Sequence, residues 1–346
     1  MISRMRCLHS FFAAIVVSTF SALPDAIGQD HGTITVYFEN DLFAGTDRYY
    51  TNGTRLSFTS ENFTAIEDAP RLPLVRPILA AIPYFQNENF QKDIGFSLGQ
   101  NTYTPDDTET SERIPGDRPY AGWLYLGFSI DRKNQFQRDA FGVQLGVVGS
   151  YSYAEETQQL IHEIRGFDMP AGWDNQLSNE FGVLLTYQRT WRWPHLESRR
   201  GLGFEILPHV GAAAGNVAIY ASAGAEARLG LNLPDDFGTA PLEAATITEA
   251  PLSGEAAVPR ARFDVGLYVF GRVEGRLVGH NIFLDGNTFQ DSQSVNHKPL
   301  VGDLSVGAAI NFRNTKLAYA FVYRTQEFSG QASGQLFGSL TLSIAY

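Results

Sequence analysis

The sequence is poor in cysteine, methionine and charge, and it lacks long apolar runs. It holds one cysteine, Cys7, and three methionines among 346 residues, and 18% of its residues are charged. A single cysteine excludes a disulfide framework and a thiolate metal cluster. The net charge of −11 argues against a nucleic-acid partner, because proteins that bind nucleic acid are normally basic. After residue 30 no apolar run is long enough for a transmembrane helix.

Aromatic residues and glycine are abundant instead. Phenylalanine, tyrosine and tryptophan make up 13% of the chain, and there are 33 glycines. A disordered protein would be low in aromatic residues, so that class is excluded. The mean hydropathy of −0.15 also argues against a helical membrane bundle.

The first thirty residues differ from the rest and predict a secretory signal peptide. Two arginines come first, a mostly apolar run follows, and small residues lead up to Gly28. We therefore predict a signal peptide over residues 1–28, which includes Cys7, and an exported chain over residues 29–346. An uncleaved anchor helix is the alternative, but the apolar run is short for a membrane span.

Apolar residues recur at every second position along the exported chain. In the segment 124–130, for example, leucine, phenylalanine and isoleucine alternate with Tyr125, Gly127 and Ser129. The intervening residues are small or neutral far more often than charged, whereas a soluble sandwich would more often place lysine and glutamate there. Small and polar residues inside, with apolar and aromatic residues outside, are typical of a transmembrane barrel.

Twelve such segments predict an all-β fold, a transmembrane antiparallel β-barrel of about twelve strands. Their number is even and their lengths suit tilted membrane strands. The last segment alternates most clearly and ends on the aromatic Tyr346, which is typical of bacterial outer-membrane barrels. We therefore predict an integral protein of the outer membrane of a Gram-negative bacterium. The predicted strands are 33–41, 51–60, 92–103, 120–131, 139–149, 180–193, 202–214, 217–230, 261–276, 299–312, 315–328 and 335–346.

The predicted topology assigns each connection to one side of the membrane. Both termini of such barrels are periplasmic, so the first strand runs outward. Two periplasmic connections, 61–91 and 231–260, are longer than the short turns expected there. We predict a helix within 71–85 in the first and mobility in the second. The connections 42–50, 104–119, 150–179, 215–216, 277–298 and 329–334 then face outside.

The outside connection 150–179 contains a predicted amphipathic helix. Ser152 and Glu155 are spaced as a capping box, which would start the helix. Gln158 and His162 are four residues apart, so they are neighbours on its polar stripe. The opposite stripe is apolar and holds Leu160, Ile161 and Ile164. The periodicity leaves open whether the polar stripe faces water or a site.

The end of the first strand carries a second candidate site. Asn40 shares the parity of the apolar residues and should face the outer wall, whereas Asp41 should point inward. A polar amide facing lipid is costly unless it is used, although headgroups could also hydrate it. Oxygen donors of this kind suit Ca²⁺, and zinc is disfavoured because cysteines and a histidine pair are missing. His162 as a general base beside bound calcium would make an ester hydrolase. No G-x-S-x-G motif indicates a serine hydrolase.

At these residues the sequence resembles the outer-membrane lipid A 3′-O-deacylase family over essentially the whole exported chain. The resemblance implies a twelve-stranded barrel with its site between the wall and a helix of an extracellular loop. It further implies Ca²⁺-dependent removal of the 3′-linked acyloxyacyl group of lipid A, with a histidine activating water. The motifs that carry it are Glu39-Asn40-Asp41, Tyr50-Thr51-Asn52-Gly53, Gly116-Asp117-Arg118, the Gln158-to-His162 helix and Trp173-x-x-Gln176-Leu177-x-Asn179.

The resemblance also implies a role for individual residues. His162 matches the catalytic base, and Gln158 matches a glutamine of the site one turn earlier. Asn40 and Asp41 match a pair thought to bind or organise calcium. Thr51 matches a hydroxyl residue of the site at the start of the second strand. Asp168 falls where the family has an acidic residue, which makes it a further predicted calcium ligand.

One departure from the family lies in the loop between the third and fourth strands. The family's characterised enzyme has a functional lysine there, whereas residues 104–116 contain none and Arg113 is their only cation. Arginine binds phosphate well, so Arg113 is predicted to contact a lipid A phosphate, although it could equally be a bystander. A catalytically silent relative that binds lipopolysaccharide and a passive small barrel therefore stay open as alternatives.

Overall fold

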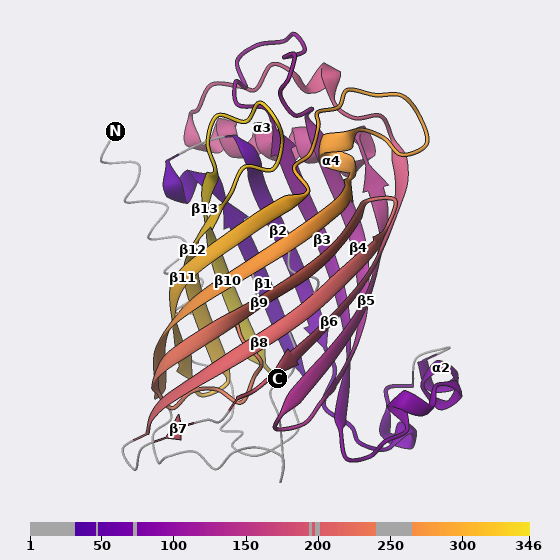
Figure 1. Cartoon of the computed structure of the whole chain (residues 1–346), viewed down its shortest axis with the longest axis vertical. Coiled ribbons are helices and arrows are strands. Elements are labelled where there is room, and N and C mark those ends of the chain that lie inside the picture. The colour runs from indigo at the N-terminus through magenta and orange to yellow at the C-terminus, as the bar shows by residue number, and fades with distance from the viewer. Residues whose placement is uncertain (1–31, 46–47, 72–74, 194–195, 198–200, 240–264) are drawn as a thin grey trace.

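The computed structural model describes residues 32–45, 48–71, 75–193, 196–197, 201–239 and 265–346. They form one closed barrel of antiparallel strands with short helices at both ends (Figure 1). The predicted signal peptide lies outside the described residues, as does most of the connection 231–260 that was predicted to be mobile. None of the helices in the described part of the chain is long and apolar enough to cross a membrane.

Twelve long strands make the barrel, as the alternation predicts. A further two-residue strand, β7 (Leu196–Glu197), pairs with the start of the strand that follows it. The twelve barrel strands are β1 (Thr33–Asn40), β2 (Tyr49–Thr59), β3 (Gln91–Thr104), β4 (Ala121–Lys133), β5 (Gln137–Val148), β6 (Glu180–Trp191), β8 (Leu202–Gly215), β9 (Ala218–Leu231), β10 (Val265–Asn281), β11 (Leu300–Phe312), β12 (Thr315–Arg324) and β13 (Gln335–Ala345).

Most strand ends lie within two residues of the prediction, and two within the described part of the chain differ by four or more for local reasons. β10 continues to Asn281, five residues beyond its predicted end. The sequence did not predict these residues as strand, because an irregularity between Val278 and His280 breaks the period-two pattern that marks a strand. β12 stops at Arg324 rather than at 328, since Phe328 forms an isolated bridge with His297 instead.

The barrel closes through two pairings that join distant parts of the chain. β1 pairs with β13, with Thr33 opposite Ala345, and β6 pairs with β8. Every barrel strand therefore has two hydrogen-bonded neighbours, and the sheet has no open edge. Closure is what the hydrocarbon requires, because lipid offers no partner for backbone N–H and C=O groups.

Side chains alternate between lipid and lumen along each strand. Leu98 and Leu126 point outward and are 50% and 55% exposed, whereas the side chains of Arg55 and Tyr125 point inward and are buried. Ion pairs between buried side chains occupy much of the lumen. Examples are Lys133–Asp93 (2.5 Å), Arg138–Asp131 (3.0 Å) and Asp303, which Arg276 and Arg324 each contact at 2.9 Å.

The helices lie at opposite ends of the barrel. The two ends are distinguished in Figure 1, where α3 and α4 cover one end and α2 lies beside the other, near the C-terminus. The helices are η1 (Asp41–Ala44), η2 (Ile66–Asp68), α2 (Val75–Ala81), η3 (Pro83–Phe85), η4 (Ser150–Ser152), α3 (Ala154–Arg165), η5 (Trp173–Asn175) and α4 (Ile282–Asp285).

The two predicted helices are present, but the predicted capping box is wrong. α2 falls within the predicted range 71–85. α3 starts at Ala154 after the turn η4, and its N-cap is Tyr153, whose side chain makes no capping hydrogen bond. The hydroxyl of Ser152 instead donates to the carbonyl of Gly149 at 2.6 Å, so it is not available to cap the helix.

Replacing Asp303 with alanine is expected to lower the free energy of unfolding by about 3–5 kcal/mol, because Arg276 and Arg324 would stay buried without the carboxylate that contacts both at 2.9 Å. Urea titration in detergent micelles measures the change. Asp107→Ala, in an exposed loop, is the matched control and should change stability by less than about 0.5 kcal/mol. Equal effects of the two substitutions would contradict a structural role for this ion-pair network.

Candidate functional site

The candidate site is a small cavity between α3 and the outer face of the barrel wall. Asn52 and Thr102 share the outward parity of Leu56 and Leu98, and they meet residues of α3 there. The cavity volume is about 10 Å³, close to the space that one water molecule needs. Its lining residues are Asn40, Leu42, Thr51, Asn52, Thr102, Thr157, Gln158, Ile161 and His162.

α3 turns its polar stripe toward the wall; of its apolar stripe, Leu160 and Ile164 point away from the protein, while Ile161 lines the cavity. Gln158 and His162 are 4% and 3% exposed, whereas Leu160 and Ile164 are 56% and 65% exposed. This resolves the alternative that periodicity left open, because the polar stripe is not a solvated face. The face of α3 turned away from the wall is mixed, because Glu156 and Glu163 are exposed there beside Leu160 and Ile164.

The tautomer of neutral His162 follows from its hydrogen bond to the backbone. Its Nδ1 lies 2.6 Å from the backbone carbonyl oxygen of Asp168. A carbonyl can only accept, so Nδ1 carries the proton and Nε2 holds the lone pair in the neutral ring. The ring also packs edge-on against Phe167, with 5.8 Å between the ring centres.

Trp173 fixes the orientation of Gln158. The indole N–H of Trp173 donates to Gln158 Oε1 at 2.9 Å, and Trp173 packs against Tyr120 with ring centres 4.9 Å apart. Both partners in the hydrogen bond are buried. The sequence places Trp173 in a motif but assigns it no role, and its contact with the helix needed the fold to be seen.

Gly122 lets the start of α3 approach the wall. A Cβ at this position would lie 2.0 Å from Ser152 Oγ and 2.4 Å from Ala154 Cβ, both far inside contact distance. Any larger residue would push the helix away from β4. The absence of a side chain at Gly122 therefore sets the depth of the cavity below α3.

Asn40 and Thr51 reach the cavity from the wall. Asn40 caps η1, with its Oδ1 accepting from the N–H of Leu42 at 2.9 Å. Thr51 would point into the lumen by simple alternation, but a bulge between Tyr50 and Asn52 turns it outward. Its hydroxyl lies 2.7 Å from that of Thr104.

The sequence matches the family described as "Outer membrane protein LpxR" over residues 10–346. The chain belongs to the LpxR family. It is therefore an integral outer-membrane protein, as the alternation and the closed barrel also indicate.

One solved structure agrees with this membership at the level of the fold. LpxR from Salmonella typhimurium is 20% identical with a TM-score of 0.70, and the match covers 91% of this chain and 100% of that one. The β domain of the Bordetella autotransporter BrkA is 8% identical with a TM-score of 0.41, covering 93% and 100% of the two chains. No curated protein matches the chain.

Asp41, Asp168 and Arg113 occupy different surroundings in this LpxR family member. Asp41 is buried beside the cavity, where its Oδ2 accepts from the N–H of Arg48 at 2.6 Å. Asp168 contributes its backbone carbonyl to His162, while its side chain is exposed. Arg113 is exposed in the loop between β3 and β4 and does not line the cavity. Metal binding by the two aspartates and phosphate binding by Arg113 stay predictions.

The oxygen atoms around the cavity are of the type that a hard cation such as Ca²⁺ prefers as ligands. The described residues contain no group of three or more His, Cys, Asp or Glu side chains arranged to hold a metal ion. Asn40, Thr51 and Asn52 offer amide and hydroxyl oxygens instead, with the carboxylate of Asp41 adjacent in sequence. Calcium accepts such neutral oxygen ligands together with a carboxylate and water, whereas zinc prefers nitrogen and sulfur.

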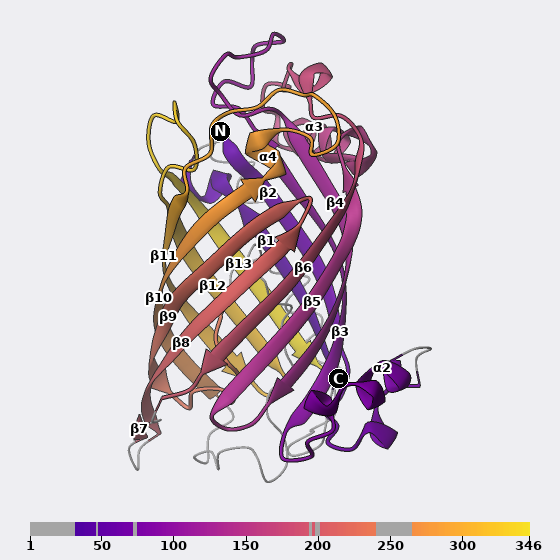
Figure 2. The ribbon, with the colours of Figure 1, turned by 45° about the vertical axis from the view of Figure 1, so that its right-hand side comes forward.

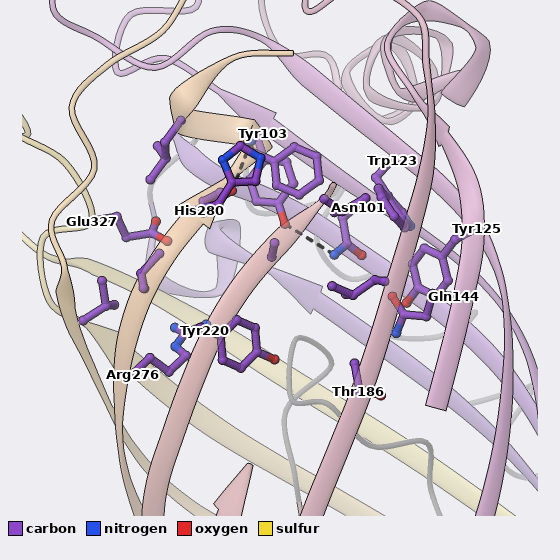
Figure 3. A pocket seen from close by; sticks show the side chains of 18 of the residues that line it. Asn101, Tyr103, Trp123, Tyr125, Gln144, Thr186, Tyr220, Arg276, His280 and Glu327 are labelled. Atoms are coloured by element: carbon purple, nitrogen blue, oxygen red, sulfur yellow. Dashed lines mark hydrogen bonds between the residues drawn. The ribbon is translucent and has the colours of Figure 1, made fainter. Parts of the chain in front are cut away.

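A larger cavity of about 100 Å³ lies inside the barrel and faces away from the site. Figure 3 shows Trp123 and Tyr125 on one side of it and Arg276, His280 and Glu327 on the other. The two cavities are on opposite faces of the same strand, β3, whose neighbouring residues point alternately inward and outward. The barrel wall therefore separates the two cavities.

Trp173→Phe is expected to loosen α3 without unfolding the barrel. The ring would still pack on Tyr120, but Gln158 Oε1 would lose its donor, at a local cost of about 1–3 kcal/mol. Hydrogen exchange of the amides of residues 154–165 should accelerate. Trp193→Phe, at a 60% exposed position, is the control and should leave this exchange unchanged. Unaltered exchange in Trp173→Phe would contradict the role assigned to the indole.

Proposed function

We propose that the protein is a lipid A deacylase, which hydrolyses the 3′-linked acyloxyacyl ester of lipopolysaccharide in the outer leaflet. One observation carries the proposal: the buried His162 lies in a polar cavity on the lipid side of the wall, at the end of the barrel opposite the C-terminus. Lipid A occupies that leaflet. Membership of the LpxR family and the exposed apolar stripe of α3 support the same substrate.

His162 would act as the general base through Nε2. Because the carbonyl of Asp168 holds the proton on Nδ1, Nε2 is the nitrogen that can take a proton from water. The water oxygen then bonds to the ester carbonyl carbon. Protonated His162 returns the proton to the departing alcohol oxygen as the carbon–oxygen bond breaks, which releases the fatty acid. The cavity has room for about one such water.

The remaining residues of the cavity would orient the ester and stabilise its oxygen. Asn40 and Thr51 bring an amide and a hydroxyl group from the wall, opposite His162 on α3. Gln158 contributes an amide whose orientation Trp173 fixes. Preset dipoles of this kind stabilise the charge that develops on a carbonyl oxygen, because they need no reorganisation during the reaction.

We further propose calcium as the cofactor, held by oxygen atoms at the end of β1. Asn40 and Asp41 are the first candidates, and the carboxylate of Asp168 is the third. When bound, calcium would polarise the ester carbonyl and stabilise negative charge on its oxygen. Asp41 contributes the negative charge that a neutral set of amides and hydroxyls lacks.

A silent lipopolysaccharide-binding relative is the second candidate. The observation that favours it is the loop 104–116, which lacks the lysine of the family's characterised enzyme. Arg113, the only cation there, is exposed and outside the cavity. A passive pore is less well supported, because buried ion pairs between neighbouring strands line the lumen.

Mass spectrometry of lipid A from cells expressing the chain tests the proposal. The expected result is loss of one 3′ acyloxyacyl unit with the unaltered chain and full-length lipid A with His162→Ala. His297→Ala is the matched control, since this histidine pairs with Asp285 away from the cavity and should retain activity. Unmodified lipid A from cells that express the correctly folded, unaltered protein would contradict the esterase proposal and favour the silent relative.

Calcium removal and Asp41→Ala test the cofactor separately. Chelation should abolish activity, and Asp41→Ala should raise the calcium concentration needed for half-maximal rate while the barrel keeps its heat-modifiable mobility on gels. Asp107→Ala, an exposed carboxylate in another loop, should leave the requirement unchanged. Full activity in chelator would contradict a calcium cofactor, and loss of heat-modifiable mobility would reassign Asp41 as structural.

A further inference from the structure

The long connection between β2 and β3 packs on the outside of the barrel. We call residues 61–71 and 75–90 the cap. Figure 2 shows its helix α2 beside the barrel wall at the end where the C-terminus lies, and Figure 1 shows the same from another side. Phe85 and Leu79 of the cap cluster with Ile94, an outward-facing residue of β3.

The cap covers polar side chains that would otherwise face lipid. Lys92, Arg132 and Asp139 have outward parity, and they are 0%, 5% and 0% exposed. Lys92 donates to the carbonyl of Thr64 at 2.5 Å. The hydroxyl of Tyr84 donates to Asp139 at 2.5 Å, and the guanidinium of Arg132 lies 4.2 Å from the ring centre of Tyr84. These contacts fix the cap on the wall.

The other face of the cap is apolar and exposed. From Pro77 to Phe85 the sequence has no charged or amide side chain. Ile78, Ile82 and Tyr84 are 47%, 40% and 37% exposed. A short helix in water would turn polar residues outward, so an exposed face of this composition indicates a contact surface.

The position of this face identifies what covers it. On β4, Leu126 and Phe128 are 55% and 43% exposed and belong to the lipid-facing wall, while Ile130, one step further, lies under the cap. The separation of Phe128 and Ile130 is about 7 Å. The exposed face of α2 therefore continues the lipid-facing surface where the wall itself turns polar.

Exposed aromatic residues lie at the same end of the barrel as the cap. Phe136, in the turn after β4, and Trp193, after β6, are 63% and 60% exposed. Outer-membrane barrels carry girdles of aromatic side chains at both membrane interfaces. The Tyr84 hydroxyl donates to Asp139 and accepts from Arg189 at 3.0 Å, while its ring is 37% exposed, as in residues of such a girdle.

We propose that the cap is an interfacial anchor that lies in the periplasmic leaflet, with Ile78 and Ile82 inserted among the acyl chains of phospholipids. The cap covers Asp139 at the depth of the headgroups together with its ion-pair partners Arg132 and Arg189, of which Arg189 keeps 31% of its side chain exposed. The cap thereby widens the barrel's contact with the periplasmic leaflet on one side only, over β3, β4 and β5. This inference is independent of the proposed esterase activity.

Site-directed fluorescence tests the anchor in the full-length protein. Cys7 is the only cysteine, so a Cys7→Ser background allows single labels at Ile78→Cys and Ile82→Cys. The environment-sensitive dye NBD is attached, and the folded barrel is placed in vesicles of phosphatidylethanolamine and phosphatidylglycerol. The expected result is blue-shifted emission at both positions, with strong quenching by spin-labelled phospholipid and weak quenching by aqueous iodide.

Glu88→Cys is the matched control within the cap, because its exposed side chain follows the apolar run. Its label should emit as in water and be quenched by iodide. Labels at Ile78 and Ile82 that behave like Glu88 would overturn the proposal. Labels shielded from both quenchers would also overturn it and indicate a protein partner on this face. Heat-modifiable mobility of each variant shows that the barrel is folded.

Discussion

The closed ring of strand pairings is the constraint on which the rest of the structure depends. Lipid cannot hydrogen-bond the backbone, so the sheet must close, and β1 meets β13 to do so. Closure leaves each strand residue facing either lipid or lumen. An outward polar side chain is then costly unless something covers it. The wall carries such side chains at two levels: Asn40, Asn52 and Thr102 below α3, and Lys92, Arg132 and Asp139 below the cap.

α3 and the cap have opposite effects on the polar side chains of the wall that they cover. The cap seals charged groups with direct contacts, as between Tyr84 and Asp139, and leaves an apolar surface for lipid. α3 encloses a cavity, because Gly122 sets how closely it approaches the wall and Trp173 holds its glutamine in place. A water-sized, polar space beside outer-leaflet lipid is what hydrolysis of a membrane ester requires, since the substrate need not leave the bilayer. The proposed function depends on this space and on the tautomer of His162.

Alternation alone predicted the barrel, its twelve strands and the outward direction of Asn40, because the period of a strand is local. Where the period breaks, prediction failed. The bulge that turns Thr51 outward and the irregularity that extends β10 leave no mark in the pattern. The orientation of α3 was ambiguous, since an apolar stripe suits both a protein core and a membrane. The contact of His162 with the carbonyl of Asp168, rather than its carboxylate, arises from a turn that residue type does not reveal.

The central claim is that the cavity below α3, rather than the lumen, meets outer-leaflet lipid. Photo-crosslinking in living cells tests it most directly. A photoreactive amino acid at Leu160, on the exposed stripe of α3, should form an adduct with lipopolysaccharide, while the same group at Tyr220, inside the barrel, should form none. An adduct at Tyr220 without one at Leu160 would contradict the account.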